Sequence, residues 1–488
     1  MTKNNVIMKL AVPMIVIGML TSCNGKSGSS SKKSSASDYP IVEIGEGLAK
    51  AALAYSQVYE FHDGYAQVRG GNSYGLIDNN GNVVLPCNYN SIELYGKVAL
   101  VNRSLCGVVS LDGREIVPCN YREENIAVFP EEELIRIEKG SQEFHFIDYE
   151  GNDILPNGLR AIIGAGKNWN KDDLVTFSEG LAAACFHFTD PDYKYGFVDR
   201  NGREVFQLRF ADPALFQGGY AWIGYALINE QGEKMVEIKD GSLVDKDGTV
   251  IIPANQFKSI GCIGADYDYG YLIVQGSNNR YGIWDIIHKK EVIPCTYDWI
   301  CSDYDERYGW SSFVKDSIVL VTNDEQYGAV NLNGKEIVPC RYKYASIENG
   351  CVIVESINPG GYSLLHGLYD KDGNELLPSE YSDIKVYDDI LVARSENRSM
   401  DWTYRLFRRD GKDEVLSVHN ALVGTYSEGL IGIKDGDKFG FYDENGDEVI
   451  APKYEEAGFF SEGLAPVKLN GKWGYVNHAG KDSFGEQK

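Results

Sequence analysis

The chain has 488 residues, of which 43% are hydrophobic, so it has enough apolar side chains for a large buried core. Its formal net charge of −24 excludes nucleic-acid binding through a basic surface and adhesion to an anionic membrane by charge alone. The 53 Gly and 32 Tyr residues are typical of many short strands joined by tight turns.

The first residues of the chain, 1–22, have the pattern of a lipoprotein signal peptide. Lys3 gives a charged start, and the apolar run of residues 10–20 is too short to span a bilayer. Leu20-Thr21-Ser22-Cys23 then resembles the bacterial lipobox, in which the chain is cut before the cysteine and the cysteine is acylated. The alternative is an ordinary signal peptide with a chance cysteine. We expect lipid on Cys23 to attach the protein to a membrane.

Residues 23–38 follow as a Ser/Lys-rich segment with almost no apolar side chain. Such a segment cannot pack, so we expect a flexible tether with a reach of roughly 20 Å. Together with the lipobox it predicts a bacterial envelope lipoprotein, for which the outer membrane is the expected location. The segment has no acidic cluster directly after Cys23, which leaves the membrane face open.

The remainder of the chain, residues 39–488, repeats one phrase about ten to twelve times. An aromatic residue precedes a Gly, a short apolar run leads to Asp or Asn, a second Gly follows, and a β-branched run ends at Pro and Tyr. The clearest copies are YGLIDNNGNVVLPCNY (Tyr74–Tyr89), YGAVNLNGKEIVPCRY (Tyr327–Tyr342), HGLYDKDGNELLPSEY (His366–Tyr381) and FGFYDENGDEVIAPKY (Phe439–Tyr454). A second phrase, such as FSEGLAPV at Phe460–Val467, precedes it.

These phrases resemble the bacterial WG-repeat (KWG) family, whose motif is clearest here at Trp473-Gly474. The resemblance implies an exported or cell-associated all-β repeat protein that binds partners, and it supplies no catalytic residues. The repeat-structural residues that it indicates are Trp473, Gly474, Gly440, Gly328 and Gly75. The first Gly of each copy is expected to let an aromatic side chain of a neighbouring unit approach the backbone.

The expected fold is all-β, with tandem three-stranded β-meanders in a propeller-like arrangement of one or two rings. An open β-superhelix is the alternative, and a division into two sub-blocks near residue 240 is a variant of the first. The last unit lacks a final strand, whereas Ile41–Tyr55 is a surplus segment that could complete it and close a ring. Residues 47–54 of that segment favour a helix instead.

Candidate chemistry is sparse. Cys87, Cys119, Cys295 and Cys340 all follow the repeat Pro, which predicts buried structural thiols, although disulfides would also fit an exported protein. The Asp-x-Asp-Gly turns at residues 245–248 and 370–373 resemble fragments of a calcium loop but lack its distal carboxylate. We therefore expect no metal and no cofactor.

The best binding candidates are aromatic residues that depart from the repeat, because insertions on a repeat scaffold form loops on one face. Residues 297–313 are the first choice. The speculative binding residues are Trp299, Tyr304, Tyr308, Trp310, Trp169 and Trp402. An insertion that packs on a neighbouring unit is the competing interpretation.

The function that these features predict is a membrane-anchored, non-enzymatic repeat lipoprotein that binds or scaffolds a protein or glycan partner. A carbohydrate-active hydrolase with a carboxylate pair is the alternative, because the separation of two acids is a property of the folded chain. A purely structural spacer is a third interpretation. The sequence leaves the ligand and the oligomeric state open.

Overall fold

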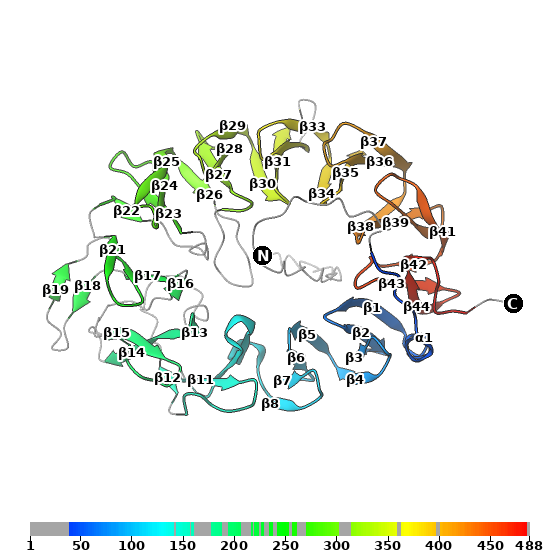
Figure 1. Cartoon of the computed structure of the whole chain (residues 1–488), viewed down its shortest axis with the longest axis horizontal. Coiled ribbons are helices and arrows are strands. Elements are labelled where there is room, and N and C mark those ends of the chain that lie inside the picture. Colours follow the sequence, from blue (N-terminus) through cyan, green and yellow to red (C-terminus); the bar gives the residue numbers. More distant parts are fainter. Residues whose placement is uncertain are drawn as a thin grey trace, which may run out of the picture. The chain divides into compact units, whose positions relative to one another are not determined.

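In the computed structural model the described residues are 39–140, 143–156, 158–160, 177–187, 194–205, 216–217, 219–223, 226–228, 234–237, 242–252, 256–260, 270–301, 314–358, 363–396 and 401–485. Their strands form twelve antiparallel sheets. All but the two-stranded sheet β18–β19 stand side by side in a ring, which leaves eleven blades in a β-propeller arrangement (Figure 1). The first strand of a blade lies on the inner side of the ring and the last strand on the outer side, as β30 and β33 show.

Blades 1 to 5 occupy the first half of the ring. Blade 1 is β1 (Gln57–His62), β2 (Tyr65–Gly70), β3 (Ser73–Asp78) and β4 (Val83–Tyr89), and blade 2 is β5 (Ser91–Tyr95), β6 (Val98–Asn102), β7 (Cys106–Ser110) and β8 (Glu115–Tyr121). Blade 3 is β9 (Ile126–Phe129), β10 (Leu134–Glu138), β11 (Glu143–Asp148) and β12 (Leu159–Arg160), and blade 4 is β13 (Phe177–Ser178), β14 (Leu181–His187) and β15 (Lys194–Asp199). Blade 5 is β16 (Phe216–Gln217), β17 (Tyr220–Ile223), β20 (Ser242–Asp245) and β21 (Val250–Ile252), and the separate hairpin is β18 (Ala226–Ile228) and β19 (Lys234–Glu237).

Blades 6 to 11 complete the ring. Blade 6 is β22 (Ser259–Ile260), β23 (Tyr271–Gln275), β24 (Tyr281–Asp285) and β25 (Lys290–Tyr297), and blade 7 is β26 (Trp299–Cys301), β27 (Ile318–Asn323), β28 (Gln326–Asn331) and β29 (Glu336–Tyr342). Blade 8 is β30 (Tyr344–Glu348), β31 (Cys351–Ile357), β32 (Leu364–Asp370) and β33 (Glu375–Tyr381), and blade 9 is β34 (Asp383–Val386), β35 (Ile390–Glu396), β36 (Trp402–Arg408) and β37 (Glu414–His419). Blade 10 is β38 (Leu422–Ser427), β39 (Leu430–Asp435), β40 (Lys438–Tyr442) and β41 (Glu448–Tyr454), and blade 11 is β42 (Glu456–Ala457), β43 (Leu464–Leu469) and β44 (Lys472–Asn477).

Most blades therefore have four strands, so the prediction of three-stranded units was one strand short. The reason lies in the phrase FSEGL, which is itself a hairpin turn. Both central residues of this turn have positive φ in blade 11, 54° at Glu462 and 82° at Gly463, as a type I′ turn requires. The residues before Glu462 thus belong to one strand and those after Gly463 to the next.

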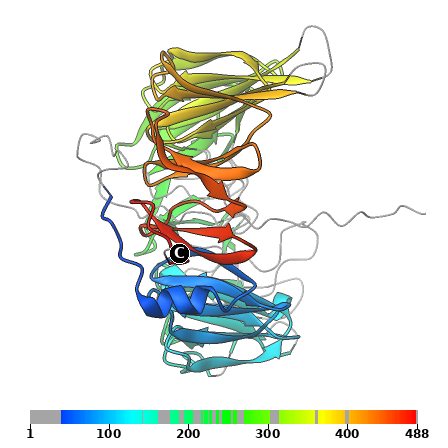
Figure 2. The same ribbon diagram turned by 90° about the vertical axis from the view of Figure 1, so that its right-hand side faces the viewer.

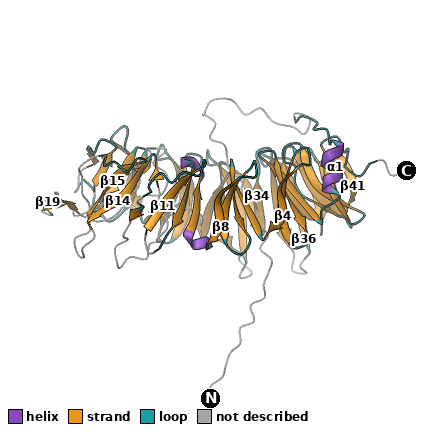
Figure 3. Ribbon diagram, turned by 90° about the horizontal axis from the view of Figure 1, so that it is seen from below, coloured by secondary structure: helices purple, strands orange, loops and turns teal. Residues whose placement is uncertain are grey.

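The core consists of separate apolar clusters between successive blades. Figure 3 shows the blades from the side, with their strands next to one another. The cluster between blades 10 and 11, for example, contains Phe441, Ile450, Tyr454, Phe460 and Val476. Because each blade packs on both faces, the strands have few polar positions in their middle residues. The motif residues Trp473 and Tyr475 belong to the cluster that joins the last blade to the first.

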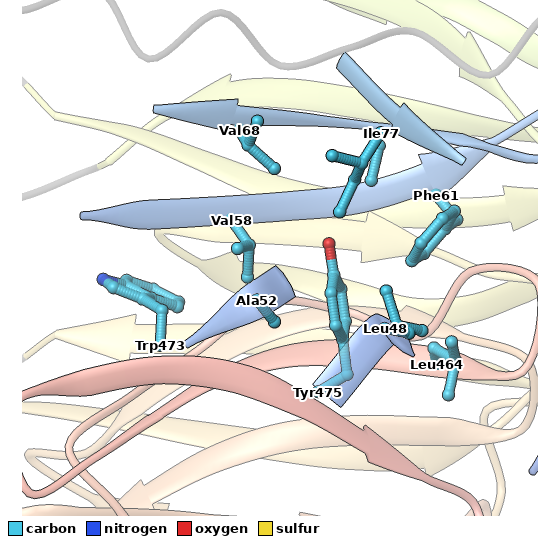
Figure 4. Packing of buried hydrophobic residues seen from close by; sticks show 10 residues of the cluster. Leu48, Ala52, Val58, Phe61, Val68, Ile77, Leu464, Trp473 and Tyr475 are labelled. Carbon is cyan, nitrogen blue, oxygen red and sulfur yellow. The ribbon is translucent and has the colours of Figure 1, made fainter. Parts of the chain in front are cut away.

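The first and last blades meet at a seam. The Tyr475 hydroxyl donates to the Tyr59 carbonyl at 2.8 Å, and the Gly64 N–H donates to the Glu462 carboxylate at 3.0 Å. Phe61 and Leu464 are fully buried there (Figure 4). The single ring is thus closed by contacts between residues about 400 positions apart, as the propeller-like prediction requires.

The segment before β1 packs on the last blade, and we call residues 39–56 the strap. The Asn477 side-chain amide donates to the Val42 carbonyl at 2.8 Å, and Lys481 pairs with Glu43 at 2.6 Å. The strap then forms helix α1 (Glu46–Ala52), which contacts β44 and lies at the outer edge beside β4 (Figures 1 and 2). The surplus segment therefore reaches the last unit as predicted, but it contributes a helix instead of a strand.

Candidate functional site

In most blades one row of paired residues crosses the strands at the WG phrase, and we call this row the rung. In blade 7 the rung is Trp299, Thr322, Tyr327 and Tyr342, one residue from each strand. In blade 8 it is Tyr344, Glu355, His366 and Tyr381. The WG aromatic is the third residue and the Tyr of the Pro-x-x-Tyr phrase is the fourth, so one sequence phrase places both rings side by side.

The first Gly of the WG phrase admits the fourth strand of its own blade. A Cβ atom added at Gly328 would lie 2.6 Å from the Val338 carbonyl oxygen, and one at Gly75 would lie 2.7 Å from that of Leu85. Both sites face a double register shift between the third and fourth strands. The expectation that Gly makes room for an aromatic of a neighbouring unit was therefore wrong, because the close neighbour is a backbone bulge within the blade.

The other two repeat-structural glycines also have close neighbours where a Cβ atom would lie. Gly440 faces the Ile450 carbonyl and Pro452 of its own blade, and Gly474 faces Ser483 and Phe484, which run beside β44 where other blades have a fourth strand. Trp473 itself is buried, and its ring lies under the Lys468 ammonium at 5.9 Å. These residues have structural roles within the blades, so a binding site has to be formed by other residues.

A row of aromatic side chains, two exposed and two half-buried, crosses blades 6 to 8, and we call Tyr281, Trp299, Tyr327 and Tyr344 the aromatic strip. Trp299 is 54% exposed and Tyr344 is 46% exposed. The ring of Trp299 meets that of Tyr281 from the preceding blade edge-on, with centroids 4.9 Å apart. Tyr344 contacts Tyr327 with the two rings tilted by 48° and their centroids 5.7 Å apart. Trp299 and Tyr327 share a rung, with Thr322 of the strand between them, so the strip consists of two ring pairs that are linked through blade 7.

A polar network braces the strip at blades 6 and 7. The Arg280 guanidinium pairs with Asp298 at 3.0 Å and donates to Asn323 Oδ1 at 3.0 Å. Asp298 in turn accepts the Asp324 N–H at 2.7 Å. Because Asp298 precedes Trp299 directly, these bonds fix the start of β26. The indole is therefore held in place without being covered.

Only part of the predicted binding set can be placed. Trp299 lies in the strip, whereas Trp402 donates its indole N–H to the Ala421 carbonyl at 3.0 Å and lies 6.0 Å from the Arg394 guanidinium, a half-buried position within blade 9. Trp169, Tyr304, Tyr308, Trp310 and the lipidation residue Cys23 lie outside the described residues. The strip also contains Tyr344, which is not among the predicted binding residues.

A hollow of about 470 Å³ lies on the turns of blades 7 to 9. It is open, and its lining is polar: Asp316, Ser317, Asn349, Gly350, Lys371 and Asp388. The Asp316 carboxylate is already engaged by the Gly350 N–H at 2.7 Å. This contact belongs to a series in which a turn carboxylate accepts an N–H of the next blade, so the hollow is a by-product of blade packing.

The carboxylates and thiols that suggested chemistry have structural partners. Oδ1 of Asp370 accepts the N–H groups of Asp372 and Asn374 at 2.9 and 2.8 Å, so this turn holds itself together. Seven cysteines of the described part, Cys87, Cys106, Cys119, Cys295, Cys301, Cys340 and Cys351, are free, and burial raises the pKa of Cys87, Cys295 and Cys340. Among described residues, no group of three His, Cys, Asp or Glu side chains is arranged to hold a metal ion.

The fold and the row of rings define a β-propeller with an exposed aromatic surface. The family model for the WG containing repeat matches residues 74–101, 195–223, 327–356 and 439–473, so the chain contains WG repeats at these four segments. No curated protein sequence matches the chain. No helix in the described part is long and apolar enough to cross a membrane.

Several solved structures are similar in outline. A computationally designed protein, Ika8, is 12% identical over 62% of this chain and 94% of its own, with a TM-score of 0.23. A eukaryotic initiation factor is 9% identical over 74% of this chain and 86% of its own, with a TM-score of 0.33. The tricorn protease is 10% identical over 85% of this chain and 46% of its own, with a TM-score of 0.20. Superposition this weak carries no functional argument.

Proposed function

We propose that the protein is a non-enzymatic binding or scaffold module of the bacterial cell envelope, anchored by lipid on Cys23, that holds a protein or glycan partner on its ring. The observation that supports binding is the exposure of Trp299 and Tyr344 on adjacent blades. Large aromatic residues contribute much of the energy of recognition when they are rigid and accessible. Here the ring neighbours and the Arg280 network supply the rigidity.

The anchor is tested by cell fractionation. Full-length protein should sediment with membranes, and Cys23→Ser should move it into the soluble fraction, because the acyl chains supply the membrane affinity. Equal membrane association of both proteins would contradict lipid anchoring.

The binding role is tested by capture from intact cells with a cross-linker. We expect wild type to enrich one envelope component, and Trp299→Ser with Tyr344→Ser to lose it. Enrichment that survives the double substitution would remove the strip from the binding role. Release of reducing sugar from envelope polysaccharide by the purified protein would replace this proposal with the hydrolase alternative.

A further inference from the structure

The repeats allow the chain to be compared with itself at the first position of each rung. Blades 7 and 8 have Trp299 and Tyr344 there. The same position is polar in most other blades, where the residues are Gln57, Ser91, Ser259, Asp383 and Glu456. A blade therefore folds without an aromatic at this position, and blade packing does not account for the two that are present.

The two rings are placed to stack with a ligand. Each contacts the WG aromatic of the preceding blade, Trp299 edge-on and Tyr344 at a tilt of 48°. The Lys343 ammonium lies over one face of the Tyr344 ring, 5.5 Å from its centre, which leaves the opposite face for a ligand. Blades 7 and 8 repeat the same arrangement, so the strip presents similar aromatic side chains on neighbouring blades of the propeller. Such a row matches a ligand that itself consists of repeated units.

The polar groups around the strip are paired with one another. Arg280 pairs with Asp298 at 3.0 Å, and Glu355 lies 3.5 Å from His366. The Arg280–Asp298 pair leaves little net charge beside Trp299, although the chain as a whole carries −24. Carboxylate, guanidinium and amide groups still provide donors and acceptors for hydroxyl groups. The flank thus fits a neutral, hydroxyl-rich ligand better than a charged one.

The shape of the strip distinguishes a sugar chain from a peptide. Peptide anchors are usually buried in pockets or grooves. The hollow described above includes no residue of the strip. Sugar rings need only an open aromatic face, against which their C–H groups pack while their hydroxyls reach polar neighbours.

We propose that the aromatic strip is a binding site for a neutral polysaccharide, two of whose sugar rings stack on Trp299 and Tyr344. This inference rests on the proposed binding function and specifies its partner. The Arg280–Asp298 pair and Asn323 would bind the hydroxyl groups beside the first ring.

The test is a binding array with immobilised neutral glucans, mannans and xylans of at least about six sugar units. Poly-L-proline and polygalacturonate are the comparison ligands. Wild type should bind at least one neutral polysaccharide, and Trp299→Ser and Tyr344→Ser should each weaken that binding about tenfold, since each removes one stacking ring. Serine is the residue that blades 2 and 6 carry at this position, so both variants are expected to fold.

Leu422→Ser is the matched control, because Leu422 is 53% exposed at the same rung position of blade 10, outside the strip. It should bind like wild type. Absence of binding to every neutral polysaccharide, or unchanged binding by both serine variants, would overturn the inference. If envelope capture depends on Trp299 while no polysaccharide binds, the partner is a protein: the proposed function then stands and the glycan assignment fails.

Discussion

A single atom decides whether a WG blade can form its bulge. At Gly328 and Gly75 the carbonyl of the fourth strand occupies the space where a Cβ would lie. Arg405 stands at the same position in blade 9, and there Tyr404, Arg405 and Leu406 pair in regular register with Val418, Ser417 and Leu416. Blade 9 thus has a side chain here and lacks the first of the two register shifts, while the second, between Leu406 and Phe407, remains.

Gly328→Ala is therefore expected to destabilise the ring by about 1–3 kcal/mol, the usual cost of overpacking a close contact. Thermal or denaturant unfolding measures it. Gly45→Ala is the control, since Gly45 has φ −67° and no atom within 4 Å of the added Cβ. Equal effects of the two substitutions would show that the close approach at Gly328 is not the cause.

The turn aspartates give stability a dependence on pH. Burial alone would raise the pKa of Asp370, but hydrogen bonds from Asn374 and from the turn backbone outweigh it and hold the pKa below 3.8. A carboxyl whose pKa is lower in the folded state stabilises the fold above its unfolded pKa, and that contribution is lost as the pH falls.

Asp370→Asn isolates this contribution. Asn331 already fills the same position in blade 7 and accepts the N–H groups of Asn333 and Lys335 at 3.0 Å, so the turn should persist. We expect wild type to be more stable than the variant near neutral pH and the difference to vanish toward about pH 2. A difference that stays constant between these pH values would contradict the assignment.

Between elements, the recurring contact is a turn carboxylate that accepts an N–H group of the next blade. The donor and acceptor pairs are Gly180 with Glu132, Gly219 with Glu179, Gly350 with Asp316, Gly463 with Glu428, and Gly64 with Glu462. The acid of the phrase FSEGL thus serves two purposes. It occupies the type I′ turn of its own blade and it fixes the neighbouring turn.

Glu462→Ala removes this bond at the seam between the first and last blades. Because the pair is exposed, we expect a loss of only about 1 kcal/mol. The sharper readout is the hydrogen exchange of the Gly64 amide, which should become faster while the amides of β1 change little. Glu462→Gln keeps an acceptor and should exchange like wild type; an equally fast exchange there would point to lost charge instead of a lost hydrogen bond.

The sequence predicted the elements that carry strong local signals. The WG strand, the Asp-Gly turns and the Pro-x-x-Tyr strand were all read correctly, because turn residues mark their ends. The innermost strand was missed because the phrase FSEGL was read as part of one strand, whereas its Glu-Gly pair forms a turn between two strands. Trp299 was found because it departs from the repeat, whereas Tyr344 was overlooked because it follows the repeat Tyr342 closely. A comparison of aligned rung positions would have identified it.

For the whole molecule, the strap is an expected source of stability. Leu48 of α1 is 1% exposed and packs in the cluster that includes Phe61 and Tyr475. Leu48→Ala should therefore cost about 2–5 kcal/mol, as large-to-small changes in a core do. Thermal unfolding checks this expectation, with Leu53→Ala as the control, because Leu53 lies just beyond the helix and is 37% exposed. A similar loss in both variants would argue against a specific role for α1.

The seam also has a consequence for how the chain is made. Gly64 emerges from the ribosome early, but its partner Glu462 is 398 residues away. Bringing such distant positions together in a free chain costs on the order of 5 kcal/mol in entropy. Blade 1 must therefore keep one apolar face unpaired until nearly all of the protein has been synthesised. During that interval the nascent chain is an open arc whose first blade exposes an apolar face. The time for which this face stays exposed depends on how quickly the last blade is synthesised and folds.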